Sequence, residues 1–250
     1  MKIWAIADLH LSFGVPGKEM DIFGPAWKDH ARRTEAHWRE LISPDDLILI
    51  PGDISWAVKF QDALPDLEWI DRLPGTKLLL KGNHDFWWSS LKQMVPQLPP
   101  SIHLIQNNSF LWKGVAIGGS RLWDTPEYSF GDYIEFQENS RQNDLIQTEL
   151  GEGIFERELH RLRLSLNTLA PTAPVRIAMT HYPPIGTDLK PSQASKILEE
   201  FRIQHCVFGH LHALKSDTKL FNKSLNGIHY HLVAGDYLHF KPTLITTAQM

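Results

Sequence analysis

A short apolar run followed at once by polar side chains recurs along this chain, most clearly in Lys77-Leu78-Leu79-Leu80-Lys81-Gly82-Asn83-His84-Asp85. Four other apolar runs end in a similar way. The five polar clusters are Asp8-Leu9-His10, Gly52-Asp53, Gly82-Asn83-His84-Asp85, His181 and Gly209-His210-Leu211-His212. Carboxylate, amide and imidazole groups are common ligands of divalent metal ions. The pattern therefore predicts a metal site assembled from segments that are far apart in the sequence.

Short apolar runs bounded by turn residues are typical of buried strands. Here they cover residues 3–7, 47–50, 77–80, 175–179 and 206–208. Segments with helical spacing lie between several of these runs, and such alternation predicts an α/β fold with a mainly parallel sheet. In an open α/β sheet, ligand-binding groups gather beyond the carboxyl ends of the strands. We therefore expect the five clusters to converge on one point.

The remaining elements are predicted from local patterns. Helices are expected at about residues 27–42, 60–73, 89–98, 152–169 and 192–201. Three short apolar runs between residues 102 and 118, separated by Asn107-Asn108 and Lys113-Gly114, indicate antiparallel strands with hairpin turns. Residues 121–143 show no clear periodicity and are expected to form an irregular insertion, whereas residues 227–245 are expected to form strands.

The ordered clusters resemble the calcineurin-like metallophosphoesterase superfamily, whose signature reads D-x-H, G-D, G-N-H-D/E, a lone H and G-H-x-H. All five blocks stand in this order between residues 8 and 212 of the 250. The resemblance implies an α/β fold in which two mixed β-sheets pack face to face with flanking helices, a four-layer αββα sandwich. Because motif blocks occur towards both ends of the chain, we expect a single domain over residues 1–250.

The resemblance also implies two divalent metal ions. Asp53 would bridge them, because two cations about 3.5–4 Å apart repel each other without a shared anion. Asp8, His10 and His212 would complete the coordination of the first ion, and Asn83, His181 and His210 that of the second. This mixture of oxygen and imidazole nitrogen suits Mn, Fe or Zn better than Ca. The sequence does not choose among the three.

Three further residues are candidates for the chemistry. In the family, hydroxide bridging the metals attacks phosphorus, and the position of His84 stabilises the phosphoryl group and protonates the leaving group. Asp85 would hold the His84 ring. Arg121 follows Gly118-Gly119-Ser120 at the end of a predicted strand, where it would bind a phosphate oxygen of the substrate; the alternative is a salt bridge to Asp124 or another neighbour.

Several other histidines carry no motif. His30, His37, His103, His160 and His205 are expected to be surface or core residues, whereas a substrate contact by His229, His231 or His239 is left open.

The function that this set favours is hydrolysis of a small phosphodiester, nucleotide or related metabolite by an enzyme similar to class III cyclic-nucleotide phosphodiesterases. Serine/threonine protein phosphatases usually continue the second block as G-D-x-x-D-R-G, but this chain reads Gly52-Asp53-Ile54-Ser55-Trp56-Ala57 and lacks that arginine. Two alternatives are kept. A nucleotide-linked lipid pyrophosphatase would use the aromatic insertion as an apolar opening, and a non-catalytic partner-binding scaffold would share the fold.

Composition narrows the class of partner. Hydrophobic residues make up 42% and charged residues 22% of the chain, which is ordinary for a globular protein. The formal net charge of −4 does not indicate a nucleic-acid-binding surface. No apolar stretch approaches the roughly 20 residues that span a bilayer. A cleavable signal peptide would remove the first strand and Asp8, so we expect a cytoplasmic protein. The oligomeric state is not encoded in any pattern found here.

Overall fold

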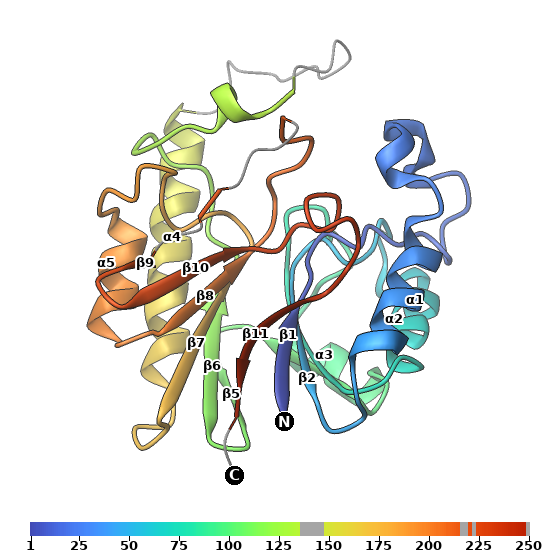
Figure 1. Ribbon diagram of the computed structural model, residues 1–250, viewed down its shortest axis with the longest axis horizontal. Coiled ribbons are helices and arrows are strands. Elements are labelled where there is room, and N and C mark those ends of the chain that lie inside the picture. Colours follow the sequence, from blue (N-terminus) through green and yellow to red (C-terminus); the bar gives the residue numbers. More distant parts are fainter. Residues whose placement is uncertain (136–147, 216–219, 222–223, 249–250) are drawn as a thin grey trace.

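Two β-sheets packed face to face form the centre of the protein (Figure 1). The computed structural model describes residues 1–135, 148–215, 220–221 and 224–248, and the side chains of all of these except residues 148–152. The first sheet has five strands in the spatial order β11 (Thr243–Thr247), β1 (Lys2–Ala5), β2 (Leu47–Pro51), β3 (Thr76–Leu80) and β4 (Ile102–Ile105).

The second sheet has six strands. Their spatial order is β5 (Ser109–Trp112), β6 (Val115–Ser120), β7 (Val175–Thr180), β8 (His205–Phe208), β10 (Ile228–Leu232) and β9 (Ser224–Leu225). In both sheets the inner strands are parallel, whereas β11, β5 and β9 pair antiparallel with their neighbours at the edges. The sheets are therefore mixed.

Helices cover the outer face of each sheet (Figure 1). The first sheet is covered by α1 (His30–Leu41), α2 (Phe60–Asp71) and α3 (Leu91–Met94), and the second by α4 (Thr148–Asn167) and α5 (Gln193–Glu200). Short 3-10 turns lie at Met20–Phe23, Pro25–Trp27, Val95–Gln97 and Gly131–Tyr133. These layers confirm the predicted αββα sandwich.

Three apolar clusters hold the layers together, and side-chain alternation along the strands explains them. In β2, which is buried throughout, Leu47 and Leu49 face the second sheet, whereas Ile48 and Ile50 face the helices. The cluster between the sheets takes residues from β1, β2, β3, β6, β7 and β8. Because both faces of the inner strands are covered, their sequences read as continuous apolar runs.

The structure corrects part of the predicted strand pairing. Lys113 and Gly114 both have positive φ (46° and 83°), which fits a tight hairpin turn between β5 and β6, and these strands pair antiparallel as expected. The strand at residues 102–105, in contrast, pairs parallel with β3. Asn107-Asn108 therefore leads from one sheet to the other instead of closing a hairpin.

The predicted helices are present with shifted ends. The first begins at His30, because Pro25–Trp27 forms a separate turn and Asp29 has a φ of 52°. Residues 121–135 are irregular apart from Gly131–Tyr133, and residues 136–143 of the expected insertion lie outside the described residues. Within the described part of the chain, no helix combines the length and apolar character needed to cross a membrane.

Candidate metal centre

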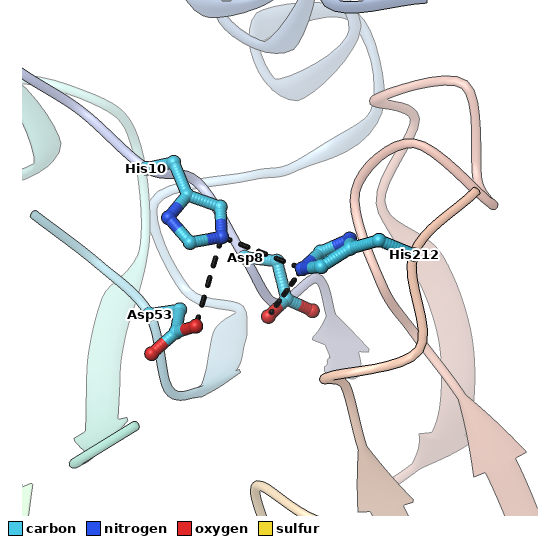
Figure 2. A group of neighbouring side chains, drawn as sticks. All are labelled: Asp8, His10, Asp53 and His212. Atoms are coloured by element: carbon cyan, nitrogen blue, oxygen red, sulfur yellow. Dashed lines mark hydrogen bonds and ion pairs between the residues drawn. The ribbon is translucent and has the colours of Figure 1, made fainter. Parts of the chain in front are cut away.

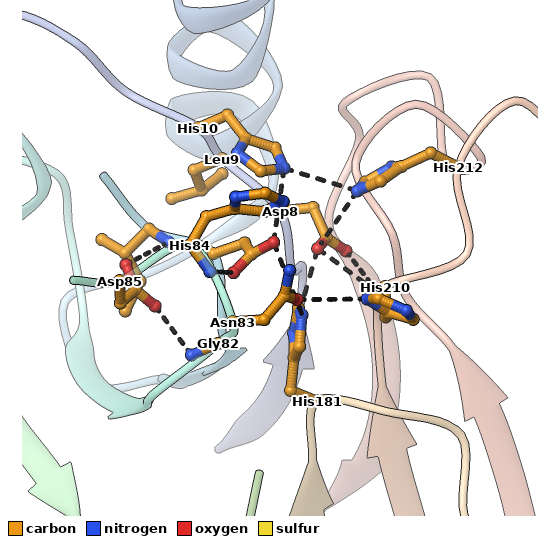
Figure 3. A network of polar contacts seen from close by, with 12 residues as sticks. Asp8, Leu9, His10, Gly82, Asn83, His84, Asp85, His181, His210 and His212 are labelled. Carbon is orange, nitrogen blue, oxygen red and sulfur yellow. Dashed lines mark hydrogen bonds and ion pairs between the residues drawn. The ribbon is translucent and has the colours of Figure 1, made fainter. Parts of the chain in front are cut away.

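All seven predicted metal ligands lie together at the carboxyl ends of the parallel strands (Figures 2 and 3). Four of them, Asp8, His10, Asp53 and Asn83, follow β1, β2 and β3 of the first sheet. The other three, His181, His210 and His212, follow β7 and β8 of the second. The site thus lies where the two sheets meet.

One group of ligand atoms is formed by Asp8, His10, Asp53 and His212 (Figure 2). One atom from each of these side chains lies within 4.8 Å of the others. His212 Nε2 is 3.4 Å from Asp8 Oδ1 and 3.4 Å from His10 Nε2. His10 Nε2 is in turn 3.6 Å from Asp53 Oδ2. Four converging donors at these spacings can surround a single cation.

A second group contains Asn83, His181 and His210. Asn83 Oδ1 lies 2.6 Å from His181 Nε2 and 3.2 Å from His210 Nδ1. His181 Nε2 is also 3.4 Å from Asp53 Oδ2, the same oxygen that faces His10. Asp53 Oδ2 therefore lies between the two groups.

Two of the histidine rings are oriented by partners behind them. His181 Nδ1 is 3.0 Å from the carbonyl oxygen of Pro51, and His212 Nδ1 is 3.0 Å from Asp236 Oδ1. With Nδ1 as the donor, Nε2 is left free to face the centre, an arrangement common among metal-binding histidines. The sequence motifs do not include Asp236. A signal was available, because Gly235-Asp236 follows the apolar run Leu232-Val233-Ala234 just as Gly52-Asp53 follows its own.

The pKa values of the imidazoles show that the buried carboxylates favour positive charge in the site. Burial lowers the pKa of His10 to about 3 against the opposing effect of Asp53, so this ring is neutral at pH 7. Burial also lowers the pKa of His181, but Asp53 outweighs it and raises this pKa to about 9. His212 behaves similarly, because Asp236 and Asp8 outweigh burial and hold its pKa well above the usual value. The buried carboxylates thus draw positive charge into the site, and divalent cations supply such charge.

Four of the predicted ligands have a strained backbone. Asp8, His10, Asp53 and His210 all have positive φ values, between 43° and 70°. Residues other than glycine seldom adopt this region, at a cost of about 1–3 kcal/mol each, and such strain clusters at functional sites. Packing around these residues therefore holds each of the four side chains in a fixed orientation.

Two motif glycines are required by close packing at the centre. Gly52 has a φ of 100°, and a Cβ atom added there would lie 2.4 Å from His181 Nδ1. A Cβ atom at Gly82 would lie 2.0 Å from Asp53 Oδ1. The glycines of the G-D and G-N-H-D blocks therefore make room for the ligands of neighbouring loops.

His84 lies beside the ligands and is half-buried. Its backbone N–H donates to Asp53 Oδ1 at 2.8 Å, and its ring centroid is 5.6 Å from that of His10 and 4.6 Å from that of Trp56. This placement leaves the ring at the edge of the centre, where it is accessible.

Asp85 differs from the expectation. Its carboxylate accepts hydrogen bonds from the backbone N–H groups of Gly82, Ile54 and Ser55 and from Trp87 Nε1. In the part of the chain that the structure describes, no hydrogen bond joins the Asp85 carboxylate to the His84 ring. Asp85 instead ties the loop after β3 to the loop after β2, so it supports the positions of Asn83 and Asp53. Burial, followed by the charge of Asp53, raises the pKa of Asp85 to about 6.

Arg121, in the segment after β6, contacts the loop that carries His181. Its carbonyl oxygen accepts the N–H groups of His181 and Tyr182, and its guanidinium contacts Glu158 at 3.4 Å. The ring of Trp123 lies 4.5 Å from the guanidinium carbon. A salt bridge is thus present, although the partner is Glu158 and not Asp124.

The histidines outside the motifs have structural surroundings. His30 is buried between the carbonyl oxygens of Leu9 and Trp27, and His37 Nδ1 is 3.0 Å from the carbonyl oxygen of Phe240. The rings of His229 and His231 lie beside that of His205, at centroid distances of 5.4 and 5.3 Å.

Comparisons with known proteins agree with this architecture. The phosphopantetheinyl hydrolase of Mycobacterium tuberculosis superposes with a TM-score of 0.57 at 16% identity, over 98% of this chain and 95% of that one. A protein of unknown function from Aquifex aeolicus gives a TM-score of 0.50 at 16% identity, over 97% and 95% of the two chains. At these identities, the likeness shows a shared fold.

Two comparisons concern the sequence itself. The gene 66 protein of Mycobacterium phage D29 is 34% identical over 83 residues, which are 33% of this chain and 40% of that protein. The chain therefore matches less than half the length of this relative. The family model described as calcineurin-like phosphoesterase matches residues 1–214, a stretch that includes all five motif blocks. On this match, which confirms the resemblance seen in the sequence, the chain belongs to the calcineurin-like phosphoesterase family.

Proposed function

We propose that this protein is a two-metal phosphoesterase that hydrolyses a small phosphodiester, nucleotide or related metabolite. The observation that carries the proposal is the position of Asp53 Oδ2, 3.6 Å from His10 Nε2 and 3.4 Å from His181 Nε2. An oxygen between two groups of ligand atoms is what a bridging carboxylate requires. Asp8, His10 and His212 would hold one ion together with Asp53, and Asn83, His181 and His210 would hold the other.

The donor atoms fit divalent ions of intermediate softness. Carboxylate and amide oxygens are combined with imidazole nitrogens, and the one cysteine, Cys206, is buried in β8. Such a set suits Mn, Fe or Zn. Two ions bound there would lower the pKa of a water molecule and neutralise charge on the phosphoryl group.

The protein's own side chains then position the substrate. His84 lies at the accessible edge of the centre, where its ring donates a proton to the leaving oxygen. Asp85 keeps the loop that carries His84 and Asn83 fixed against the loop that carries Asp53. The half-buried Trp56 ring stacks on His10 at 4.9 Å and so forms one wall beside the reacting group.

The two alternatives fit less well. A lipid pyrophosphatase needs an apolar opening, but in the described part of the insertion Trp123 packs against Tyr182, and Phe130 packs against Phe221. A scaffold has no reason to keep seven ligand-type side chains in contact, four of them on strained backbone.

Three expectations from the sequence stay predictions: a single domain over residues 1–250, a cytoplasmic location, and the absence of a nucleic-acid partner.

Turnover of bis(4-nitrophenyl) phosphate tests the proposed function. We expect hydrolysis by the Mn²⁺-loaded protein, loss of activity with a chelator and recovery when Mn²⁺, Fe²⁺ or Zn²⁺ is returned, because the attacking water depends on the ions. The reference is the Asp53→Ala variant under the same metal conditions, which we expect to be inactive. Undiminished activity after exhaustive chelation would exclude this mechanism.

A further inference from the structure

A basic cavity of about 470 Å³ lies at the carboxyl ends of β3, β4 and β6, the same end of the strands as the proposed metal centre. It is lined by the residues that follow β3, β4 and β6, and by one face of α4. Four of the lining residues are basic, namely Lys81, Arg121, Arg157 and Arg161, and Glu158 is the one acidic residue among those described there. The cavity is therefore positive, although the chain as a whole carries a formal charge of −4.

The single carboxylate in the cavity serves two guanidinium groups. Glu158 is buried, and its Oε1 lies 2.7 Å from Arg161 Nη1 and 3.4 Å from Arg121 Nη2. One negative charge thus orients two positive ones without neutralising both.

Arg121 also has unused hydrogen-bonding capacity. Its Nε atom is buried and has no acceptor in the described part of the chain. A buried donor without a partner is unfavourable. Guanidinium groups bind phosphate through pairs of N–H donors, so Arg121 suits an oxyanion in the cavity.

The cavity shares two loops with the proposed ligands. Lys81 is two residues before Asn83, and Arg121 accepts the backbone N–H of His181 through its carbonyl oxygen at 3.1 Å. Trp88 and Ser89, which line the cavity, follow the G-N-H-D block. The cavity and the proposed metal centre are thus built partly from the same loops, which carry basic residues close in sequence to two of the proposed ligands.

We propose that this cavity binds a second phosphate group of the substrate, so that the enzyme acts on compounds carrying a phosphate in addition to the one that reacts. The inference rests on the proposed function. Arg157 and Arg161, one turn apart on α4, contact this second phosphate from one side, and Lys81 and Arg121 contact it from the other. A cavity of 470 Å³ is within the usual size for small-molecule sites and also admits part of the group that joins the two phosphates.

A matched pair of chromogenic substrates tests this inference. One is the 4-nitrophenyl ester of thymidine 5′-phosphate, and the other is the same ester with an added 3′-phosphate. Both release 4-nitrophenolate, so the bond that breaks is the same. We expect the Mn²⁺-loaded protein to show at least a tenfold higher kcat/KM for the bisphosphate. In the Arg157→Gln/Arg161→Gln variant, the ratio of the two kcat/KM values should fall to about one.

Arg163→Gln is the control, because Arg163 is on the same helix but pairs with Glu200 and does not line the cavity. This variant should keep the preference of the unmodified protein. Equal kcat/KM values for the two esters in the unmodified protein would overturn the second-phosphate site while leaving the proposed function standing. A preference that survives in the double variant would also overturn it.

A protein that cleaves neither ester would count against the proposed function. The cavity is then tested separately by isothermal titration of the same metal-loaded protein with inorganic pyrophosphate. Binding that weakens at least tenfold in the Arg157→Gln/Arg161→Gln variant and persists in Arg163→Gln supports an anion site there. Unchanged or absent binding refutes it.

Discussion

The replacement Asp236→Asn probes the protein's control of the His212 ring. Asp236 Oδ1 accepts from His212 Nδ1 at 3.0 Å, and Oδ2 accepts the Ala213 N–H at 2.9 Å. Asparagine has the same size but only one acceptor oxygen. If that oxygen keeps the Ala213 N–H, the new NH₂ group faces His212 Nδ1. The ring must then carry its proton on Nε2, the atom that lies 3.4 Å from Asp8 Oδ1 and is proposed to bind metal.

The size of the effect follows from this conflict. Turning the asparagine round restores an acceptor for His212 but sets its NH₂ group against the Ala213 N–H. An unmade buried hydrogen bond costs about 1–3 kcal/mol. Losing the partner of a metal-binding histidine typically weakens metal affinity 10–100-fold, which corresponds to about 1.4–2.8 kcal/mol. Both routes therefore lead to a loss of similar size at the first ion.

Calorimetric titration of the metal-free protein with Mn²⁺ would measure this loss. We expect two binding steps, of which one is weakened 10–100-fold in Asp236→Asn while the other changes little. Asp188→Asn is the control, because it removes the same charge from an exposed pair with Lys190. Unchanged affinities in Asp236→Asn, or an equal loss in both steps, would refute the proposed tautomer control.

Three other substitutions give two separate tests. Asp53→Ala should abolish metal binding and turnover together. His84→Ala should keep both ions and slow the reaction about 10²–10⁴-fold, with a smaller loss for nitrophenolate than for an alkoxide leaving group. Metal analysis and rates with both leaving groups measure these effects, and loss of a metal ion in His84→Ala would contradict the prediction. Burial raises the pKa of Asp66, which accepts from the Phe13 N–H and from Ser55 Oγ, to about 6 in the folded protein. The stability associated with this raised pKa is complete below pH 3.8 and is lost as pH rises through 6, so Asp66→Asn should gain up to about 3 kcal/mol relative to the unmodified protein between pH 4 and 7. Urea unfolding at several pH values measures this, and a difference that does not change with pH would contradict it.

The fold and the proposed ligands could be predicted because their signals are local. An apolar run ending in Gly-Asp or Gly-Asn-His-Asp reports both a strand and the polar loop that follows it, and the order of the blocks supplied the architecture. The Lys113-Gly114 turn was recognised for the same reason, since a two-residue hairpin depends on the backbone preferences of its own residues.

The features that the sequence did not reveal depend on distant partners. The direction of β4 is set by its pairing with β3, and a run of four apolar residues carries no information about that choice. Asp85 was assigned to the neighbouring His84 ring, but four donors from two loops compete for its oxygens. Glu158, the partner of Arg121, is 37 residues away on α4.

The meeting of the two sheets at the metal centre has a consequence for the energetics of the whole molecule. Each proposed ion would take ligands from both sheets. Asp53 of the first sheet would be shared by the two ions, one also held by His212 and the other by His181 of the second sheet. Ions bound there would connect the two sheets, and separating the sheets would require the ions to be released. By mass action, an ion at 100 times its dissociation constant adds about 2.7 kcal/mol to the free energy of unfolding. With the ions bound as proposed, the availability of metal would set the protein's resistance to heat and proteases as well as its activity.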